Sequence, residues 1–99
     1  MNIKIHSIHF TADQKLLDFV ENKMSKFNQL YDNIVAIEVF LRLINDQSAN
    51  NKVAEIKIDI PGNDLFASRK SKSFEEATDQ CIDALKVQII RHKEKIRGK

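Results

Sequence analysis

Alternating apolar and polar positions divide much of the chain into short segments typical of β-strands. The clearest lies over 54–60, where Ala54, Ile56, Ile58 and Ile60 alternate with Glu55, Lys57 and Asp59. A second run covers 37–43, and a short first one lies at 3–6. Because successive side chains of a strand point to opposite faces, each run has one apolar and one polar face. The pattern predicts three strands, and a fourth over 65–70 that returns after a Pro-Gly-Asn-Asp turn at 61–64.

Two other segments repeat apolar residues at steps of three and four, which predicts two amphipathic helices. The first follows Thr11, which with Gln14 fits a Thr-x-x-Gln capping box, and it ends near Asn33. Its apolar positions are Leu16, Leu17, Val20, Met24, Phe27 and Tyr31. The second starts at Ser73, which with Glu76 forms another capping box, and extends to the end of the chain. Its apolar positions are Phe74, Thr78, Cys81, Ile82, Leu85, Ile89 and Ile96.

The predicted elements follow one another in the order β-α-β-β-β-α. A strand-helix-strand start favours a right-handed crossover, which makes the first two strands parallel, and the next two pairs are expected to be antiparallel. One face of each strand is polar, so both helices are expected to cover the same face of the sheet and leave the other in water. The predicted fold class is therefore α+β, a two-layer sandwich with a four-stranded mixed sheet.

The bulk composition is that of one soluble globular domain, which we expect to span residues 1–99. Apolar residues make up 42% and charged residues 30% of the chain, and two Gly and one Pro leave no linker-like stretch. The first ten residues lack the apolar region of a signal peptide, and no apolar run reaches the length of a membrane span. The single cysteine, Cys81, cannot form an internal disulfide. These features predict a cytoplasmic protein.

Positive charge is concentrated at the end of the second predicted helix. From residue 86 onward the chain has six cations and one acid, so these fourteen residues carry a net charge of +5 within a total of +2. The cations are Lys86, Arg91, Lys93, Lys95, Arg97 and Lys99, and the acid is Glu94. Cations complement the negative end of a helix dipole, but that effect accounts for about two or three of them. The pattern therefore favours a surface that binds phosphate.

His92 has two interpretations. By its helical angle it falls within the apolar stripe of the second helix, where it would cover the end of the core. Its neighbours in sequence are cations, so it could also contact a phosphate or a base, and a histidine beside phosphate is readily protonated. Both interpretations stay open at this point.

Few other side chains have a spacing that indicates chemistry. His6 and His9 lie at the end of a strand with no cysteine pair or third ligand nearby, so they do not predict a metal site. Cys81 lies on an apolar stripe and is interpreted as a small core residue. Asp79 and Asp83 lie one helical turn apart and are interpreted as solubility residues without acid–base chemistry. Since the chain has no glycine-rich phosphate loop or Ser-His-Asp pattern either, we expect no catalysis and no metal or other cofactor.

Three groups of residues form a pattern that covers nearly the whole chain. They are Lys23-x-x-Lys26-Phe27 leading into Tyr31-Asp32-x-Ile34, Pro61-Gly62 followed by Leu65-Phe66-Ala67, and Ile82-Asp83-x-Leu85-x-x-Gln88-Ile89-x-Arg91-His92-Lys93-x-Lys95. In these motifs the chain resembles the ribosome hibernation promoting factor family, also called the ribosome-associated translation inhibitor family. The resemblance implies the same βαβββα fold and binding to the small ribosomal subunit and its RNA, in the channel used by mRNA and tRNA. It also implies a translation inhibitor that protects idle ribosomes under stress.

The resemblance further implies which side chains bind ribosomal RNA. The matching positions are Lys23, Lys26, Arg91, His92, Lys93 and Lys95, to which the charge run adds Lys86 and Arg97. Family members commonly carry basic residues where this chain has Ala84 and Val87, which predicts weaker contact along the middle of the last helix. Longer members continue into a linker and a dimerising domain. The resemblance therefore implies a short form that does not pair ribosomes through such a domain.

A function of a different class is the main alternative. The open face of the predicted sheet carries Phe40, which we expect to be exposed. Together with acidic patches, this face would suit a protein-interaction module, for example one that modulates a transcription factor. Salt-insensitive binding to a protein partner, without ribosome association, would favour this alternative.

Overall fold

All six predicted elements are present in the computed structural model, which describes residues 2–31, 33–45, 47 and 49–97. They are β1 (Asn2–Ile8), α1 (Gln14–Leu30), β2 (Ala36–Leu43), β3 (Lys52–Ile60), β4 (Asn63–Ser71) and α2 (Phe74–Arg97). In α2, side chains are described as far as residue 95. The order is the predicted β-α-β-β-β-α. Within the described residues, neither helix combines the length and the apolar character needed to cross a membrane.

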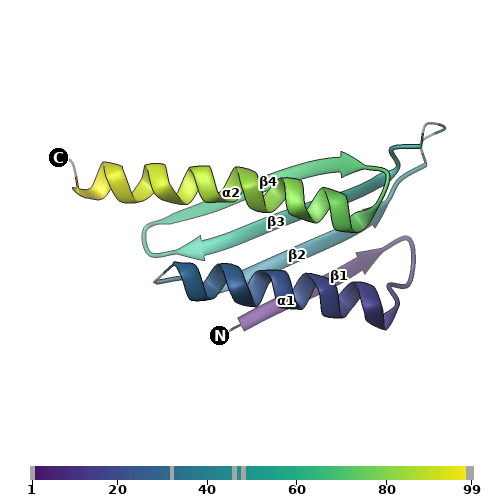
Figure 1. Cartoon of the computed structure of the whole chain (residues 1–99), viewed down its shortest axis with the longest axis horizontal. Coiled ribbons are helices and arrows are strands. Elements are labelled where there is room, and N and C mark those ends of the chain that lie inside the picture. Colours follow the sequence, from purple (N-terminus) through teal and green to yellow (C-terminus); the bar gives the residue numbers. More distant parts are fainter. Residues whose placement is uncertain (1, 32, 46, 48, 98–99) are drawn as a thin grey trace.

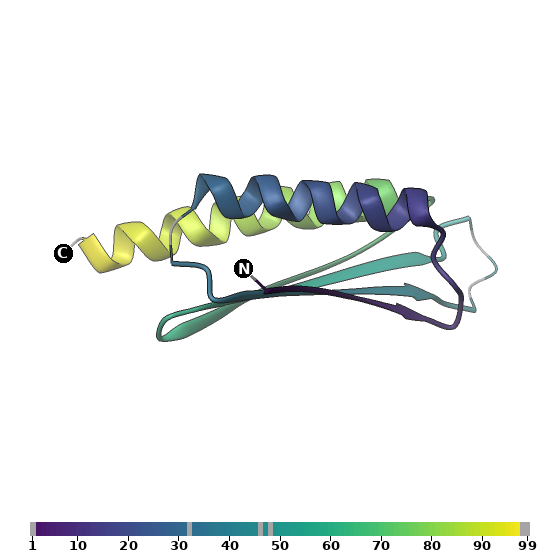
Figure 2. The same ribbon diagram turned by 90° about the horizontal axis from the view of Figure 1, so that it is seen from below.

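The four strands form one mixed sheet in the order β1-β2-β3-β4. β1 pairs with β2 in parallel, and the other two pairs are antiparallel, as predicted. Both helices lie on the same face of this sheet and run in the same direction, and no described element covers the other face (Figure 1, Figure 2). The predicted two-layer α+β sandwich is therefore confirmed.

The apolar faces of the strands and helices meet in one core between the two layers. Its buried sheet residues are Ile37, Val39 and Leu41 of β2, Ala54, Ile56, Ile58 and Ile60 of β3, and Leu65 and Ala67 of β4. The helices contribute Leu16, Val20, Met24 and Phe27 of α1, and Phe74, Ala77, Cys81, Ile82, Leu85 and Ile89 of α2. Nearly all are positions that the two periodicities mark as apolar, so the predicted core is confirmed where side chains are described. The side chain of Ile96, the last position of the predicted stripe, lies outside the described residues. Tyr31 packs against the margin of this core and is only half-buried, and Leu17 is half-buried as well.

Helix α1 begins two positions later than the capping box predicts. Gln14 is the first helical residue, and Oδ1 of the preceding Asp13 accepts a 2.9 Å hydrogen bond from the N–H of Leu16. Thr11 is therefore not the N-cap, and this prediction was wrong. Threonine and aspartate both suit an N-cap. Because the helix starts at Gln14, the N–H of Leu16 has no acceptor within the helix, and Asp13 is the residue placed three positions before it. After the helix, Asn33 has a φ of 71°, which asparagine tolerates better than most residues.

The turn between β3 and β4 is shorter than predicted. Ile60 is paired with Asn63, so only Pro61 and Gly62 connect the strands. Gly62 has a φ of 80°, the value required at the third position of a type II turn, and proline suits the second position. Because strand pairing continues up to this tight turn, β4 starts earlier than the predicted 65–70, at Asn63. At its other end it continues to Ser71, which pairs with Lys52.

Helix α2 starts at the predicted cap. The N–H of Glu76 donates a 3.0 Å hydrogen bond to Oγ of Ser73, which confirms Ser73 as the N-cap. The Glu76 carboxylate accepts a hydrogen bond from the hydroxyl of Ser71, so it ties the helix to the end of β4. Glu75 and Glu76 also place negative charge in the first turn, where the helix dipole favours it.

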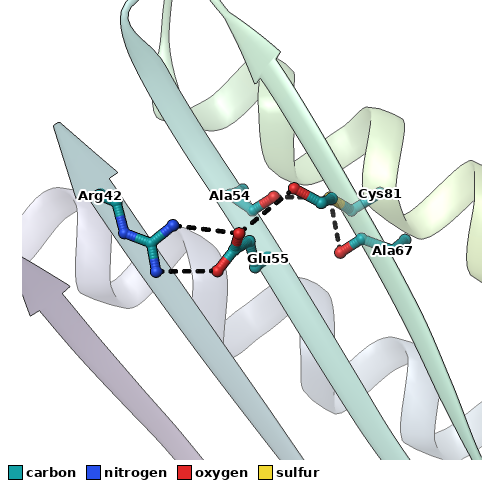
Figure 3. A network of polar contacts seen from close by, with 6 residues as sticks. Arg42, Ala54, Glu55, Ala67 and Cys81 are labelled. Carbon is teal, nitrogen blue, oxygen red and sulfur yellow. Dashed lines mark hydrogen bonds and ion pairs between the residues drawn. The ribbon is translucent and has the colours of Figure 1, made fainter. Parts of the chain in front are cut away.

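Several charged side chains on the open face of the sheet are paired with one another. Arg42 and Glu55 make two contacts across β2 and β3, Nη1 to Oε2 at 3.1 Å and Nη2 to Oε1 at 3.0 Å (Figure 3). His6 Nε2 lies 2.7 Å from Oε2 of Glu38, and the His6 ring stacks on Phe40 at 4.9 Å. Phe40 is therefore half-buried rather than exposed as expected, because His6 lies opposite it in the strand register.

Cys81 connects α2 to the two strands beneath it. Its Sγ lies 3.2 Å from the carbonyl oxygen of Ala54 in β3 and 3.7 Å from that of Ala67 in β4 (Figure 3). Burial raises the pKa of the Cys81 thiol from 9.0 to about 11. The thiol therefore stays protonated at neutral pH and can donate to these carbonyls. Cys81 is a core residue, as predicted.

Candidate nucleic-acid interface

Helix α2 extends beyond the sheet at its C-terminal end (Figure 1, Figure 2). Its 24 residues make a helix about 36 Å long, and among its described side chains Ile89 is the last buried one. Arg91, Lys93 and Lys95 follow and are all exposed. The helix is thus anchored by its front part and exposed at its basic end, as the sequence predicts.

A cleft of about 430 Å³ lies between the two helices. We call it the interhelical cleft, and it is lined by Lys23, Lys26, Phe27 and Leu30 of α1 and by Asp79, Ile82, Asp83 and Lys86 of α2. Phe27 and Ile82 are buried and form its apolar base, with the charged groups around them. The cleft therefore brings together three predicted RNA-binding lysines from helices that are far apart in the sequence.

Lys23 is held in this cleft by two contacts. Its Nζ lies 3.2 Å from Oδ1 of Asp79 and 5.4 Å from the centre of the Phe19 ring. The interpretation of Asp79 as a solubility residue is therefore incomplete, because its carboxylate neutralises a predicted RNA-binding lysine. Sequence reasoning missed this pairing, since two residues on different helices leave no spacing signal in a single sequence.

Lys93 connects the basic end of α2 to the end of α1. Its Nζ lies 5.1 Å from the ring centre of Tyr31, the residue that follows α1, which is a cation–π distance. Tyr31 in turn packs against Phe27, with the ring centres 4.9 Å apart. Lys86 precedes Lys93 by two helical turns, so the flank of α2 that carries both faces α1. The cations of this flank and those of α1 therefore share one surface.

The opposite flank of α2 lies against the edge strand β4. Gln88 Nε2 donates a 2.8 Å hydrogen bond to the carbonyl oxygen of Phe66, and the N–H of Phe66 donates a 3.3 Å hydrogen bond to Gln88 Oε1. Arg91 and Lys95 follow Gln88 at steps of three and seven residues, so they lie on this flank. They are therefore separated by the width of α2 from the cations that face α1.

Gln88→Ala is expected to uncover part of this sheet edge. The amide of Gln88 pairs with both backbone groups of Phe66, much as a neighbouring strand would. Because these hydrogen bonds are exposed, we expect a loss of about 0.5–1.5 kcal/mol in the free energy of unfolding. We also expect faster hydrogen exchange at the Phe66 amide, measured by NMR. The matched control is Gln80→Ala, an exposed glutamine on the same helix; equal protection of Phe66 in both variants and wild type would contradict the role of Gln88.

The remaining predicted positions have different surroundings. His92 is half-buried, and its contact with phosphate stays a prediction. The side chain of Arg97 lies outside the described residues. Ala84 packs against the core and Val87 is 48% exposed, so α2 presents apolar side chains at both positions. Within the described residues, no group of three or more His, Cys, Asp or Glu side chains is placed to hold a metal ion.

Known proteins similar to this chain match it over nearly its full length. The chain is 28% identical over 97 residues to the ribosome hibernation promoting factor of Klebsiella oxytoca, covering 98% of this chain and 96% of that protein. It is 28% identical over 95 residues to the protein of that name in Pseudomonas putida, covering 96% and 89%. The predicted resemblance to ribosome hibernation promoting factors is therefore confirmed.

Solved structures and a family model agree with this match. The Thermus thermophilus Protein Y N-terminal domain is 26% identical with a TM-score of 0.76, covering 93% of this chain and 99% of that one. A ribosomal subunit interface protein from Coxiella burnetii, 20% identical, has the same fold with a TM-score of 0.82, covering 94% and 98%. The family model described as Sigma 54 modulation protein / S30EA ribosomal protein matches residues 3–97. The chain therefore belongs to the Sigma 54 modulation protein / S30EA ribosomal protein family.

Proposed function

We propose that this protein is a ribosome-associated translation inhibitor and hibernation factor that binds the small ribosomal subunit in the channel used by mRNA and tRNA. The observation that carries the proposal is the placement of lysines from both helices on one surface, beside the exposed basic end of α2. Family membership supports the ribosome as the partner, because relatives over nearly the whole chain are named ribosome hibernation promoting factors. We place this activity in the cytoplasm, in one ribosome-binding domain spanning residues 1–99. The proposed contacts with ribosomal RNA are Lys23, Lys26, Lys86, Arg91, His92, Lys93, Lys95 and Arg97.

The mechanism follows from charge and rigidity. Folded ribosomal RNA presents phosphate groups in fixed positions, and proteins recognise it largely by shape and charge. The two helices rest on a sheet through one buried core, so they present their cations at fixed separations. A domain bound in this way occupies space that mRNA and tRNA need. Inhibition then results from exclusion and requires no chemical step.

Co-sedimentation with ribosomes tests the proposal. At about 50 mM salt the protein is expected to sediment with small subunits, and to leave them as salt is raised. If about six cations each neutralise one phosphate, affinity falls roughly 10³-fold between about 50 and 200 mM salt. A protein that stays at the top of the gradient at the lower salt, while the subunits sediment, would contradict the proposal.

Competition tests the location of the site. An excess of mRNA and tRNA bound to the small subunits is expected to displace the protein, because both would need the same channel. Sedimentation of the protein with small subunits that are saturated with mRNA and tRNA would show that it binds elsewhere on the ribosome.

A second candidate function is a protein-interaction module that modulates a transcription factor. The family description includes modulation of Sigma 54, and Phe66 keeps 51% of its surface exposed. Its neighbours Leu65 and Ala67 are buried, so Phe66 points to the open face of the sheet. This candidate predicts that the chain binds a protein partner with an affinity insensitive to salt, and that it does not associate with ribosomes. The same gradients therefore distinguish the two candidates.

A further inference from the structure

The interhelical cleft contains acidic side chains, although it lies on a surface proposed to bind RNA. Three lysines and two aspartates line the cleft, so its charged groups sum to +1 rather than +3. Asp79 and Asp83 lie one helical turn apart on α2 and line the cleft together with lysines of both helices. A phosphate that enters the cleft therefore meets carboxylates as well as ammonium groups.

Asp79 makes a defined contact in this cleft. Its Oδ1 lies 3.2 Å from Nζ of Lys23, which is ion-pair distance. The side chains of Asp79 and Lys23 are 50% and 39% exposed, so RNA can reach the pair, and exposed ion pairs are held weakly. A phosphate can replace the carboxylate at Lys23, but it must first separate the pair and then stay close to a negative charge.

We propose that Asp79 limits the RNA affinity of this protein by competing with phosphate for Lys23, while Asp83 lowers the positive potential of the same cleft. The inference rests on the proposed function, because it takes the helical layer as the RNA-binding surface. In the free protein Asp79 neutralises Lys23, so the pair adds no net positive charge to offset a phosphate and displaces fewer of the counterions condensed on the RNA. Binding is therefore weaker and less dependent on salt than the number of lysines suggests.

Asp79→Asn tests this competition, because it removes the charge and keeps the size and one hydrogen-bond acceptor. We expect the variant to bind small ribosomal subunits about two- to fivefold more tightly at about 100 mM salt, the range open to one exposed ion pair. We also expect the slope of log affinity against log salt to steepen by about 1. Both quantities come from a binding titration repeated over a salt series.

The matched control is Glu21→Gln. It makes the same change in net charge at an exposed residue of α1, whose helical angle places it on the flank away from the cleft. Because Asp79 is half-exposed, we expect both variants to keep the circular dichroism spectrum and the thermal midpoint of wild type. Binding by Asp79→Asn that is no tighter than binding by Glu21→Gln would overturn the inference.

Immobilised heparin separates this inference from the proposed function, because it is a polyanion without ribosomal shape. Asp79→Asn is expected to elute from heparin at higher salt than wild type and Glu21→Gln. That shift, found together with a wild-type protein that fails to sediment with ribosomes, would refute the proposed function and support the competition at Lys23. Equal elution of all three proteins would overturn the competition.

Discussion

Replacement of Lys26, Arg91 and Lys95 by glutamine in one variant is expected to weaken binding to small ribosomal subunits by about 10²- to 10³-fold at about 100 mM salt. All three side chains are exposed, and they lie on α1 and on the β4 flank of α2, so the change removes cations from both parts of the helical layer. Each neutralised phosphate contributes nearly tenfold at this salt through counterion release. The slope of log affinity against log salt is therefore expected to become shallower by about 2 to 3, as measured by titration over a salt series.

The control for this variant replaces Lys4, Lys57 and Lys72 by glutamine. It lowers the net charge by the same amount, but these cations lie elsewhere. Lys4 alternates with the partly buried Ile3 and Ile5, and Lys57 with the buried Ile56 and Ile58, so both point to the open face of the sheet. Lys72 precedes α2. We expect its affinity to stay within about twofold of wild type, since salt screens distant charges. Equal losses in the two variants would mean that total charge, and not the helical layer, governs binding.

Leu85→Ala is expected to lower the free energy of unfolding by about 2–5 kcal/mol. Leu85 has 0% exposure in the middle of α2, so truncation removes buried apolar surface and leaves a cavity between the helix and the sheet. A domain of this size has a total stability of about 5–15 kcal/mol, so the loss is a large part of it. Urea unfolding followed by circular dichroism measures the change. Ribosome binding is expected to fall as the unfolded fraction rises, because the cations of α2 depend on the docking of that helix.

Val87→Ala is the matched control for the buried leucine. Val87 lies two residues further along the same helix and is 48% exposed, so we expect a change within about 0.5 kcal/mol. A loss smaller than about 1 kcal/mol for Leu85→Ala, comparable with that of Val87→Ala, would show that this part of α2 does not anchor the helix.

The fold could be predicted from local pattern because burial follows periodicity. Alternation in 54–60 places every second residue in the core, and the three-four spacing in α2 does the same for its stripe. Ser73 was identified correctly as a cap because its partner lies three residues away. The cap of α1 was misplaced since Thr11 and Asp13 are both suitable types, and only the backbone path selects Asp13.

The candidate site could be predicted as a set of residues but not as an arrangement. Charge counting found the cations of α2, and helical angles divided them into two flanks. Which flank faces α1 depends on how α2 is rotated about its axis on the sheet. The cation–π contact between Lys93 and the Tyr31 ring shows that rotation. Gln88 belongs to the family motif, yet its described contacts are with the backbone of Phe66, a residue 22 positions earlier.

The sequence by itself determined the six elements, their order, the buried stripes and the concentration of positive charge, because each depends on residues a few positions apart. Tertiary structure decided that Lys23 faces Asp79, that lysines of both helices share one cleft, and that His6 covers Phe40. These contacts join residues that are distant in the chain. The first two arise only when the two helices pack side by side on the sheet, and the third only when β1 pairs with β2, so no local spacing records them.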